Sequence, residues 1–335
     1  KDNECIKREL SNSKWLEIFK DAKDIGLKKV NMTGGEIFCR SDSIELIKDT
    51  INMGLNVSIE TNGTMITESQ IKELSQYKDN LSMSISLDGI TSETNNLTRG
   101  NGSFEKTFNT IKTIKKYNIP LRIITVLSDN NYDEIPKLAK TIHEELGLGF
   151  RLLPNIIEYG KGVTANDEYG VSYPKIKKLM DDFYYDFLRK HAEDENLTIE
   201  LNMAIIPIDI YRHSFCPWGK AMLGIGYSGN VALCHVASDN DMFIFDNVKN
   251  NKISDIWKYN KKLLKFVNEN PDDLKGVCGN CLARSLCRGG CRLHAMSKYL
   301  GDFYAPDPDC QKVYDIGMFP EYALDDVEKV CNYEK

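Results

Sequence analysis

The feature of this sequence that most constrains its fold is a cysteine-rich stretch near the C-terminus, residues 277–310. Half of the ten cysteines lie there, at positions 278, 281, 287, 291 and 310. A Cys-x-x-Cys pair brings two thiolates to one metal, and a second pair on the same loop can complete the coordination sphere. Cys216 and Cys234 approach from upstream and raise the set to seven thiolates, nearly twice the need of one tetrahedral site. The stretch therefore predicts a domain that holds metal clusters.

Length and composition narrow the class of protein. A chain of 335 residues suggests about two domains. The formal charge of −6, without a long basic run, gives no support for a nucleic-acid partner, and no apolar run or signal peptide indicates a membrane. Secreted disulfide scaffolds are usually much shorter, whereas these cysteines have metal-ligand spacing in a large chain. We therefore expect a reduced, cytoplasmic metalloprotein.

Strand and helix patterns alternate over the first half of the chain. Strands are expected at residues 28–33, 56–61, 81–87, 121–127 and 149–153, with amphipathic helices between them. This rhythm predicts parallel strands joined by right-handed crossovers, and thus an α/β fold that forms most of a barrel. Farther on, we expect an amphipathic helix over 172–193, a hairpin around Ser228-Gly229-Asn230 that delivers Cys234, and a helix over 253–267.

Polar residues gather just after three of these strands, where such folds place their active sites. The segments are Thr33-Gly34-Gly35-Glu36, Thr61-Asn62-Gly63 and Ser86-Leu87-Asp88-Gly89, and Arg99 follows shortly after. Each segment alone is typical of an ordinary turn. Together they suit a zwitterionic ligand with a ribose, with Glu36 for the ammonium group and Ser86 and Arg99 for the carboxylate.

With these motifs the sequence resembles the radical S-adenosylmethionine (radical SAM) enzymes that carry a C-terminal SPASM extension with two auxiliary [4Fe-4S] clusters. The SPASM pattern runs from Cys216 over twelve residues to Gly229 and over four more to Cys234, then through the cysteine loop to Cys310. The resemblance implies an incomplete (β/α)6 radical SAM partial TIM barrel followed by a small cysteine-rich SPASM domain. The implied boundaries are 1–165 for the barrel without its first strand and cluster loop, 166–205 for a bridging helical segment, and 206–335 for the SPASM domain.

The resemblance also implies site residues. It assigns SAM binding to Gly34, Gly35, Glu36, Asn62, Ser86, Asp88 and Arg99, with Ile37 where the family has a proline. It assigns the auxiliary cluster farther from SAM to Cys278, Cys281, Cys287 and Cys310, and the nearer cluster to Cys216, Cys234 and Cys291. The nearer cluster then has an iron that is open to a substrate thiolate, unless Cys331 or Cys39 fills it. Structural zinc is the alternative for the cysteine loop.

The family's three-cysteine motif for the SAM-cleaving cluster is absent, since Cys5 stands alone. We expect that motif upstream of Lys1; the alternative is a degenerate, inactive relative. No catalytic residue is assigned, although His235, next to Cys234, is a candidate on the substrate side.

The activity that the resemblance implies is cleavage of SAM to a 5′-deoxyadenosyl radical and oxidative modification of a peptide, giving a thioether or a carbon–carbon crosslink. A one-electron donor such as ferredoxin or flavodoxin would be the partner. Oxidation of a tetrapyrrole or another small molecule is one alternative, because two motifs resemble the branch that modifies haem precursors. They are Cys287-Arg-Gly-Gly-Cys291-Arg, and Gly301-Asp302 before Pro306-Asp-Pro-Asp-Cys310. A non-catalytic metal-binding scaffold is the other alternative. The substrate, the bond formed and the oligomeric state are left open.

Overall fold

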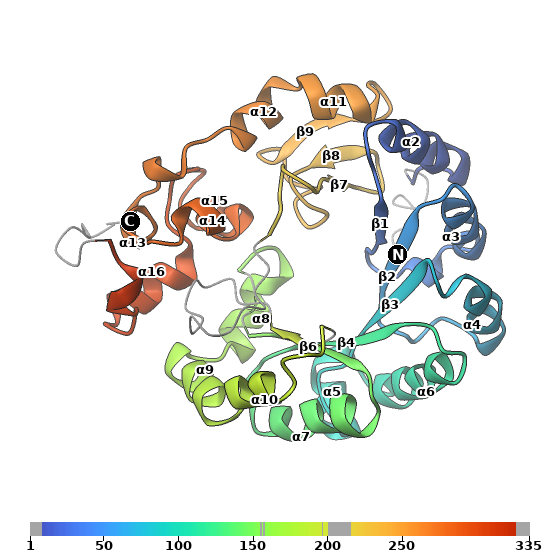
Figure 1. The fold of residues 1–335 in the computed structure, drawn as a ribbon, viewed down its shortest axis with the longest axis horizontal. Coiled ribbons are helices and arrows are strands. Elements are labelled where there is room, and N and C mark those ends of the chain that lie inside the picture. Colours follow the sequence, from blue (N-terminus) through green and yellow to red (C-terminus); the bar gives the residue numbers. More distant parts are fainter. Residues whose placement is uncertain (1–8, 155, 157, 196, 200–215, 326–335) are drawn as a thin grey trace. The chain divides into compact units, whose positions relative to one another are not determined.

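The computed structural model describes residues 9–325 apart from 155, 157, 196 and 200–215 (Figure 1). Cys5 and Cys331 lie outside the described residues, so the prediction for Cys331 as a ligand has no structural counterpart. The chain divides into two compact units, each made of separate segments. The first unit comprises Lys1–Leu87, Thr98–Ile123 and Pro217–Asn268, and the second comprises Asp88–Leu97, Ile124–Cys216 and Glu269–Lys335.

The expected α/β class with a parallel sheet is confirmed. The sheet has six strands, and their order follows the chain, β1-β2-β3-β4-β5-β6. Strand β4 (Leu121–Val126) and helix α5 (Ser92–Arg99) each have residues in both units. The linear domain boundaries implied by the resemblance stay a prediction, because the compact units interleave along the chain.

The first unit begins as three parallel strands with helices along one side (Figure 1). Its elements are α2 (Asn12–Asp24), β1 (Lys29–Met32), α3 (Ser43–Asn52), β2 (Asn56–Thr61), α4 (Glu68–Leu74), β3 (Leu81–Ser86) and α6 (Ser103–Lys116), with short 3-10 turns at Ile37–Cys39 and Ser75–Tyr77. Ile59 of β2 pairs with Met32 of β1 and with Met83 of β3. Residues alternate between buried and less buried along β2 and β3, so one face of the strands forms the core.

Local signals explain where these helices begin and end. Thr67 and Gln70 form a capping box at the start of α4, because the Thr67 side chain accepts from the Gln70 N–H and the Gln70 side chain accepts from the Thr67 N–H. Gly26 follows the C-terminus of α2 with φ +105°, a conformation that favours glycine.

The first unit also contains a small antiparallel sheet. The expected hairpin is confirmed as β7 (Gly224–Ile225) and β8 (Asn230–Ala232), and β9 (Ile244–Asn247) adds a third strand that the sequence did not suggest. The single helix expected over 253–267 is wrong. Two helices, α11 (Ile253–Tyr259) and α12 (Lys261–Val267), meet at Asn260, whose side chain accepts from the Leu263 N–H at 2.9 Å and so caps α12.

The second unit contains the last two strands and the C-terminal helices. Its elements are a 3-10 turn (Tyr132–Glu134), α7 (Ile135–Lys140), a π-helical turn (Thr141–Glu145), β5 (Gly149–Leu153), α8 (Lys161–Tyr169), α9 (Tyr173–Leu179), a second π-helical turn (Met180–Tyr184), α10 (Tyr185–Lys190) and β6 (Leu197–Ile199). A 3-10 turn (Pro271–Asp273), α13 (Gly276–Gly279), α14 (Arg284–Cys287), α15 (Arg292–Lys298), α16 (Pro308–Asp315) and a final 3-10 turn (Glu321–Ala323) follow.

Residues 166–205, where a helical bridge was expected, contain the helices α9 and α10 and also a strand, β6. Leu197 pairs with Phe150 of β5 in parallel, so this segment supplies a sixth strand. The strand is only three residues long and follows a polar stretch, which hid it from a search for alternating hydrophobicity. Among the described residues, no helix is both long and apolar enough to cross a membrane.

Candidate functional site

The ends of β1, β2 and β3 form the first candidate site, which we call the strand-end site: Gly34, Gly35, Glu36, Asn62 and Ser86. Glu36 is buried, and its Oε1 accepts from the Thr61 hydroxyl at 2.8 Å and from the Phe38 N–H at 3.1 Å. Its Oε2 accepts from the Asn62 N–H at 2.9 Å. The carboxylate therefore ties the turn after β1 to the end of β2, and Oε2 keeps a lone pair for a further donor.

The two glycines before Glu36 leave space for a ligand. Gly34 has φ +145°, which only glycine adopts readily, and a Cβ atom added at Gly34 or Gly35 would meet no heavy atom within 4 Å. Both residues are exposed. The backbone here can thus approach a bound molecule without a side chain in the way.

The remaining predicted SAM residues differ in their surroundings. Asn62 is half-buried, and its side-chain oxygen accepts from the Thr64 N–H at 2.8 Å, which shapes the turn after β2. Ser86 ends β3 half-buried, and Arg99 ends α5 exposed. Asp88 is buried in the second unit, where its Oδ1 accepts from the Val126 N–H at 3.0 Å. Asp88 thus has a structural bond already, and its role towards SAM stays a prediction.

The second candidate site lies in the second unit and consists of Cys278, Cys281, Cys287 and Cys310, which we call the C-terminal thiol site. All four side chains line one cavity, together with Val277, Arg284, Gly289 and Phe319. Three short helices supply three of them: Cys278 from α13, Cys287 from the end of α14, and Cys310 from the first turn of α16, while Cys281 lies between α13 and α14. Three of the thiols are buried, and Cys287 is half-buried.

The cavity is electrostatically unfavourable for thiolates alone. Burial raises the pKa of Cys278 and Cys281, and raises that of Cys287 to about 12, with Asp307 adding to the effect at Cys278 and Cys287. A bound metal reverses this preference, because it stabilises coordinating thiolates directly. The donor set is therefore typical of a metal-loaded site.

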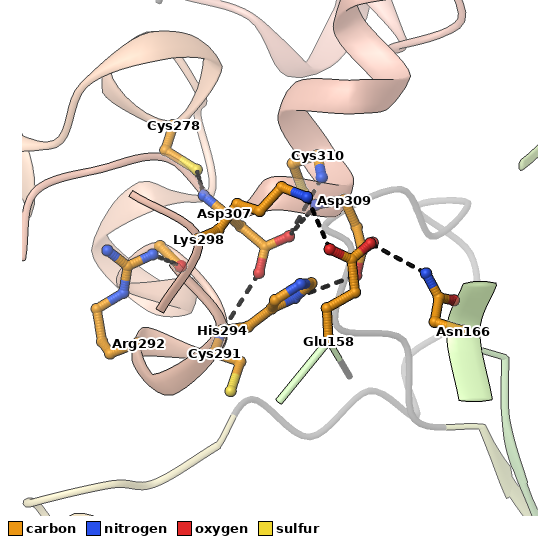
Figure 2. Close-up of polar contacts among 11 residues, drawn as sticks. Glu158, Asn166, Cys278, Cys291, Arg292, His294, Lys298, Asp307, Asp309 and Cys310 are labelled. Carbon is orange, nitrogen blue, oxygen red and sulfur yellow. Dashed lines mark hydrogen bonds and ion pairs between the residues drawn. The ribbon is translucent and has the colours of Figure 1, made fainter. Parts of the chain in front are cut away.

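Asp307 is the polar centre of this region (Figure 2). It is fully buried, and its carboxylate accepts from the backbone N–H groups of Cys291, Asp309 and Cys310 at 3.1–3.3 Å. Its own N–H donates to the Cys278 sulfur at 3.3 Å. Burial, with the neighbouring Asp309, raises the pKa of Asp307 to about 7. The Asp307 side chain thus fixes the backbone at two cysteines, and its backbone N–H contacts a third.

Beside Asp307 lies a polar group formed by Glu158, Asn166, His294, Lys298 and Asp309 (Figure 2). Glu158 accepts from Lys298 Nζ at 2.8 Å and from Asn166 Nδ2 at 3.0 Å. His294 is 1% exposed, its Nδ1 lies 3.8 Å from Asp309 Oδ2, and burial lowers its pKa. These contacts tie the loop after β5 to α15.

The other predicted metal ligands are not gathered within one unit. Cys234 lies half-buried in the first unit, whereas Cys216 and Cys291 belong to the second. The set therefore stays a prediction. His235 and Cys39 are exposed in the first unit.

The C-terminal thiol site fits an iron–sulfur cluster. Four cysteines line a common cavity, and four thiolates are the ligand set of a [4Fe-4S] cluster.

Two family models match this chain where the sequence motifs lie. Residues 3–142 match the radical SAM superfamily, and residues 216–282 match the iron–sulfur cluster-binding domain SPASM. The chain is therefore a radical SAM protein with a SPASM domain, a class that uses SAM and iron–sulfur clusters.

Relatives with curated names fall into two groups. The chain is 27% identical to the PqqA peptide cyclase of Rhizobium meliloti over 91% of its own length and 79% of the cyclase. It is 26% identical to the AdoMet-dependent heme synthase of Methanosarcina barkeri over 67% of its own length and 66% of the synthase. The chain thus spans slightly less than two thirds of that synthase.

Solved structures share the fold. Streptococcus suis SuiB bound to precursor peptide SuiA aligns with a TM-score of 0.71 at 20% identity, over 90% of this chain and 69% of SuiB. The native anSMEcpe with bound AdoMet and a peptide aligns with a TM-score of 0.65 at 20% identity, over 90% of this chain and 88% of anSMEcpe. These likenesses support the same partial barrel with a SPASM extension.

The sequence motifs contain Arg292 and Asp307 but did not predict that both side chains are buried at this site. Asp307 precedes Pro308, and an acidic N-cap before a proline at the first helical position is a recognisable helix start. Arg292 has no such signal, because an arginine after a cysteine is expected on the surface.

Proposed function

We propose that this protein is a radical SAM enzyme that oxidatively modifies a peptide, forming a thioether or a carbon–carbon crosslink. The observation that carries the proposal is the gathering of four cysteines around one cavity in a chain whose N-terminal part matches the radical SAM superfamily. A peptide is the preferred substrate class because the peptide cyclase relative aligns with 91% of the chain, against 67% for the heme synthase. We place the enzyme in the cytoplasm, with ferredoxin or flavodoxin as its electron donor.

The chain's own residues would prepare the strand-end site for SAM. When bound and reductively cleaved, SAM supplies a 5′-deoxyadenosyl radical that abstracts a hydrogen atom from the substrate. Glu36 would accept a hydrogen bond from the methionine ammonium group through the free lone pair of Oε2, while its other bonds hold the turn. The exposed Gly34 and Gly35 would allow close backbone approach. Ser86 and Arg99 would bind the carboxylate.

The seven cysteines would divide between two auxiliary clusters. Cys278, Cys281, Cys287 and Cys310 would complete one cluster, and Cys216, Cys234 and Cys291 would leave an open position in the other. An open position suits a substrate thiolate, which would direct a thioether. Oxidation of a tetrapyrrole is the second candidate function, supported by the heme synthase relative.

The full gene product, reconstituted anaerobically with iron and sulfide, tests the proposal. Reduced with dithionite in the presence of SAM, it should form 5′-deoxyadenosine. Candidate peptides encoded beside the gene should lose two hydrogen atoms by mass spectrometry, while a haem precursor should remain unchanged. Absence of 5′-deoxyadenosine would sink the enzyme proposal, and oxidation of the haem precursor alone would select the second candidate.

A further inference from the structure

Arg292 is a buried arginine between the segments that carry the cysteines of the C-terminal thiol site. It is 1% exposed and begins α15 directly after Cys291. Its Nη1 donates to the carbonyl oxygens of Phe303 at 2.7 Å and Ala305 at 2.8 Å. Its Nη2 donates to the carbonyl oxygen of Gly289. Figure 2 shows Arg292 in the same close-up as Cys278 and Asp307.

These bonds join two loops that lead to different cysteines. Gly289 lies between Cys287 and Cys291 and lines the cavity of the thiol site. Phe303 and Ala305 lie in the segment that leads into Cys310. The fit is close, because a Cβ atom at Gly289 would lie 2.6 Å from Arg292 Nη2, and Gly289 has φ +76°. The guanidinium group therefore fixes the spacing of both loops.

The same side chain brings an unusual charge into the interior. Arginine keeps its charge in proteins, and a buried charge is costly unless it is compensated. The Arg292 Nε donor is buried and has no hydrogen-bond partner within the described part of the chain. Because Arg292 donates to Gly289, which lines the cavity, its positive charge lies beside the C-terminal thiol site.

We propose that Arg292 is a positioning residue of the C-terminal thiol site, and that its buried charge makes the iron–sulfur cluster held there easier to reduce. The inference rests on the proposed function in that it takes these four thiols to hold a cluster. Reduction adds an electron to a cluster that is already negative with its thiolates. A nearby positive charge in a low-dielectric interior stabilises that added charge more than it would in water. Asp307, which is fully buried at the same site, opposes this effect when it is ionised.

The test compares three variants of the chain after anaerobic reconstitution. Arg292→Met removes the charge and the fork of donors, Arg292→Lys keeps the charge without the fork, and Lys298→Met removes an exposed charge from the same helix. Iron and sulfide content, the rate of iron loss to a chelator, and the reduced fraction in an EPR-monitored titration are measured. The EPR signal that is present in the wild type and lost in Cys278→Ala is assigned to the C-terminal thiol site.

We expect Arg292→Met to lower the reduced-to-oxidised ratio at a fixed potential about tenfold, equivalent to ~59 mV for one electron. Arg292→Lys should hold the ratio near that of the wild type but release iron several-fold faster, and Lys298→Met should change neither. If Arg292→Met does not hold its cluster, the test relies on the rate at which Arg292→Lys loses iron to the chelator. A rate equal to that of the wild type overturns the positioning role. An unchanged ratio in a fully loaded Arg292→Met chain overturns the electrostatic role. If the wild type and Cys278→Ala give the same EPR signals, the four thiols do not hold a cluster, and the cluster assignment itself fails.

Discussion

The strand-end site and the C-terminal thiol site are built in opposite ways. In the strand-end site, regular parallel strands place the residues, and Glu36 is satisfied by three hydrogen bonds from its own unit. In the thiol site, the cysteines come from short helices and loops, and the interior contains buried thiols, Asp307 and Arg292. The first site is complete as protein, whereas the second has charges and thiols that a metal would balance.

The difference indicates where each site obtains its stability. Sheet pairing and apolar packing stabilise the strand ends without a ligand. Helices of four to eight residues are marginal alone, and here they carry the thiol site, so metal binding contributes directly to folding. We therefore expect the two sites to respond very differently to metal removal and to substitution.

Loss of the metal should produce the largest effect. A Cys278→Ser/Cys281→Ser double variant should hold about four iron atoms fewer per chain. Residues 276–315 should then exchange their amide hydrogens much faster, because short helices lose the cluster that orders them. Strands β1 to β3 should keep their protection in the same experiment. If residues 276–315 exchange their amide hydrogens equally slowly with and without iron, the thiol site does not depend on metal for its folding.

Removal of the Asp307 carboxylate should have the next largest effect. Asp307→Ala leaves three backbone N–H groups without their acceptor, and we expect a loss of about 4 kcal/mol in the free energy of unfolding. Asp307→Asn keeps one acceptor oxygen and should cost about half as much. Denaturant titration of the reconstituted chain measures both. A loss below about 1 kcal/mol for alanine would show that the loops are held by other contacts.

Substitution at the strand-end site should affect ligand binding rather than the clusters. Glu36→Ala and Arg99→Ala should each weaken SAM binding by about 1.5–3 kcal/mol, the usual range for charged hydrogen bonds. Iron content should stay at the wild-type level. Glu60→Ala, on the half-buried side of β2, is the matched control. Calorimetric affinities equal to that of the wild type would mean that this pocket does not bind the methionine moiety.

The smallest effect should come from the ion pair between Lys298 and Glu158, whose side chains are 42% and 25% exposed. Lys298→Met should cost only about 0.5 kcal/mol at neutral pH, because solvent screens the pair. Burial raises the pKa of Glu158, but the hydrogen bond and charge of Lys298 outweigh it and leave that pKa below its ordinary value. The contribution of the ion pair to the free energy of unfolding is therefore present above the ordinary pKa of a glutamate. It is lost as the pH falls through the lowered pKa of Glu158.

Denaturation at pH 7 and at about pH 3.5 checks this dependence. The difference between wild type and Lys298→Met should shrink at the lower pH. A difference that grows on acidification would contradict the assignment of the pair.

The sequence predicted the regular parts of the molecule well. Strands β2 and β5 have the expected bounds, because alternating hydrophobic residues between turn signals predict a half-buried strand. The hairpin before Cys234 was predicted from Ser228-Gly229-Asn230 for a similar reason. Strand β6 was missed because three residues are too few for a periodic signal.

The polar interior of the thiol site could not be predicted. Cysteine spacing indicated which thiols form a set, but it gave no sign that Arg292 and Asp307 would be buried beside them. Such burial depends on loops that are distant in sequence, since Arg292 reaches the carbonyls of Phe303 and Ala305. Local patterns record periodicity and caps, whereas the environment of a charge is a property of the folded chain.

The contact between Gly290 and Asp307 has an evolutionary consequence. Gly290 has φ +68°, and a Cβ atom there would lie 2.2 Å from Asp307 Oδ2, inside any possible contact distance. A side chain at 290 would displace the Asp307 carboxylate, and loss of that carboxylate would free the amide groups of two cysteines. We therefore expect positions 290 and 307 to vary together among relatives of this chain.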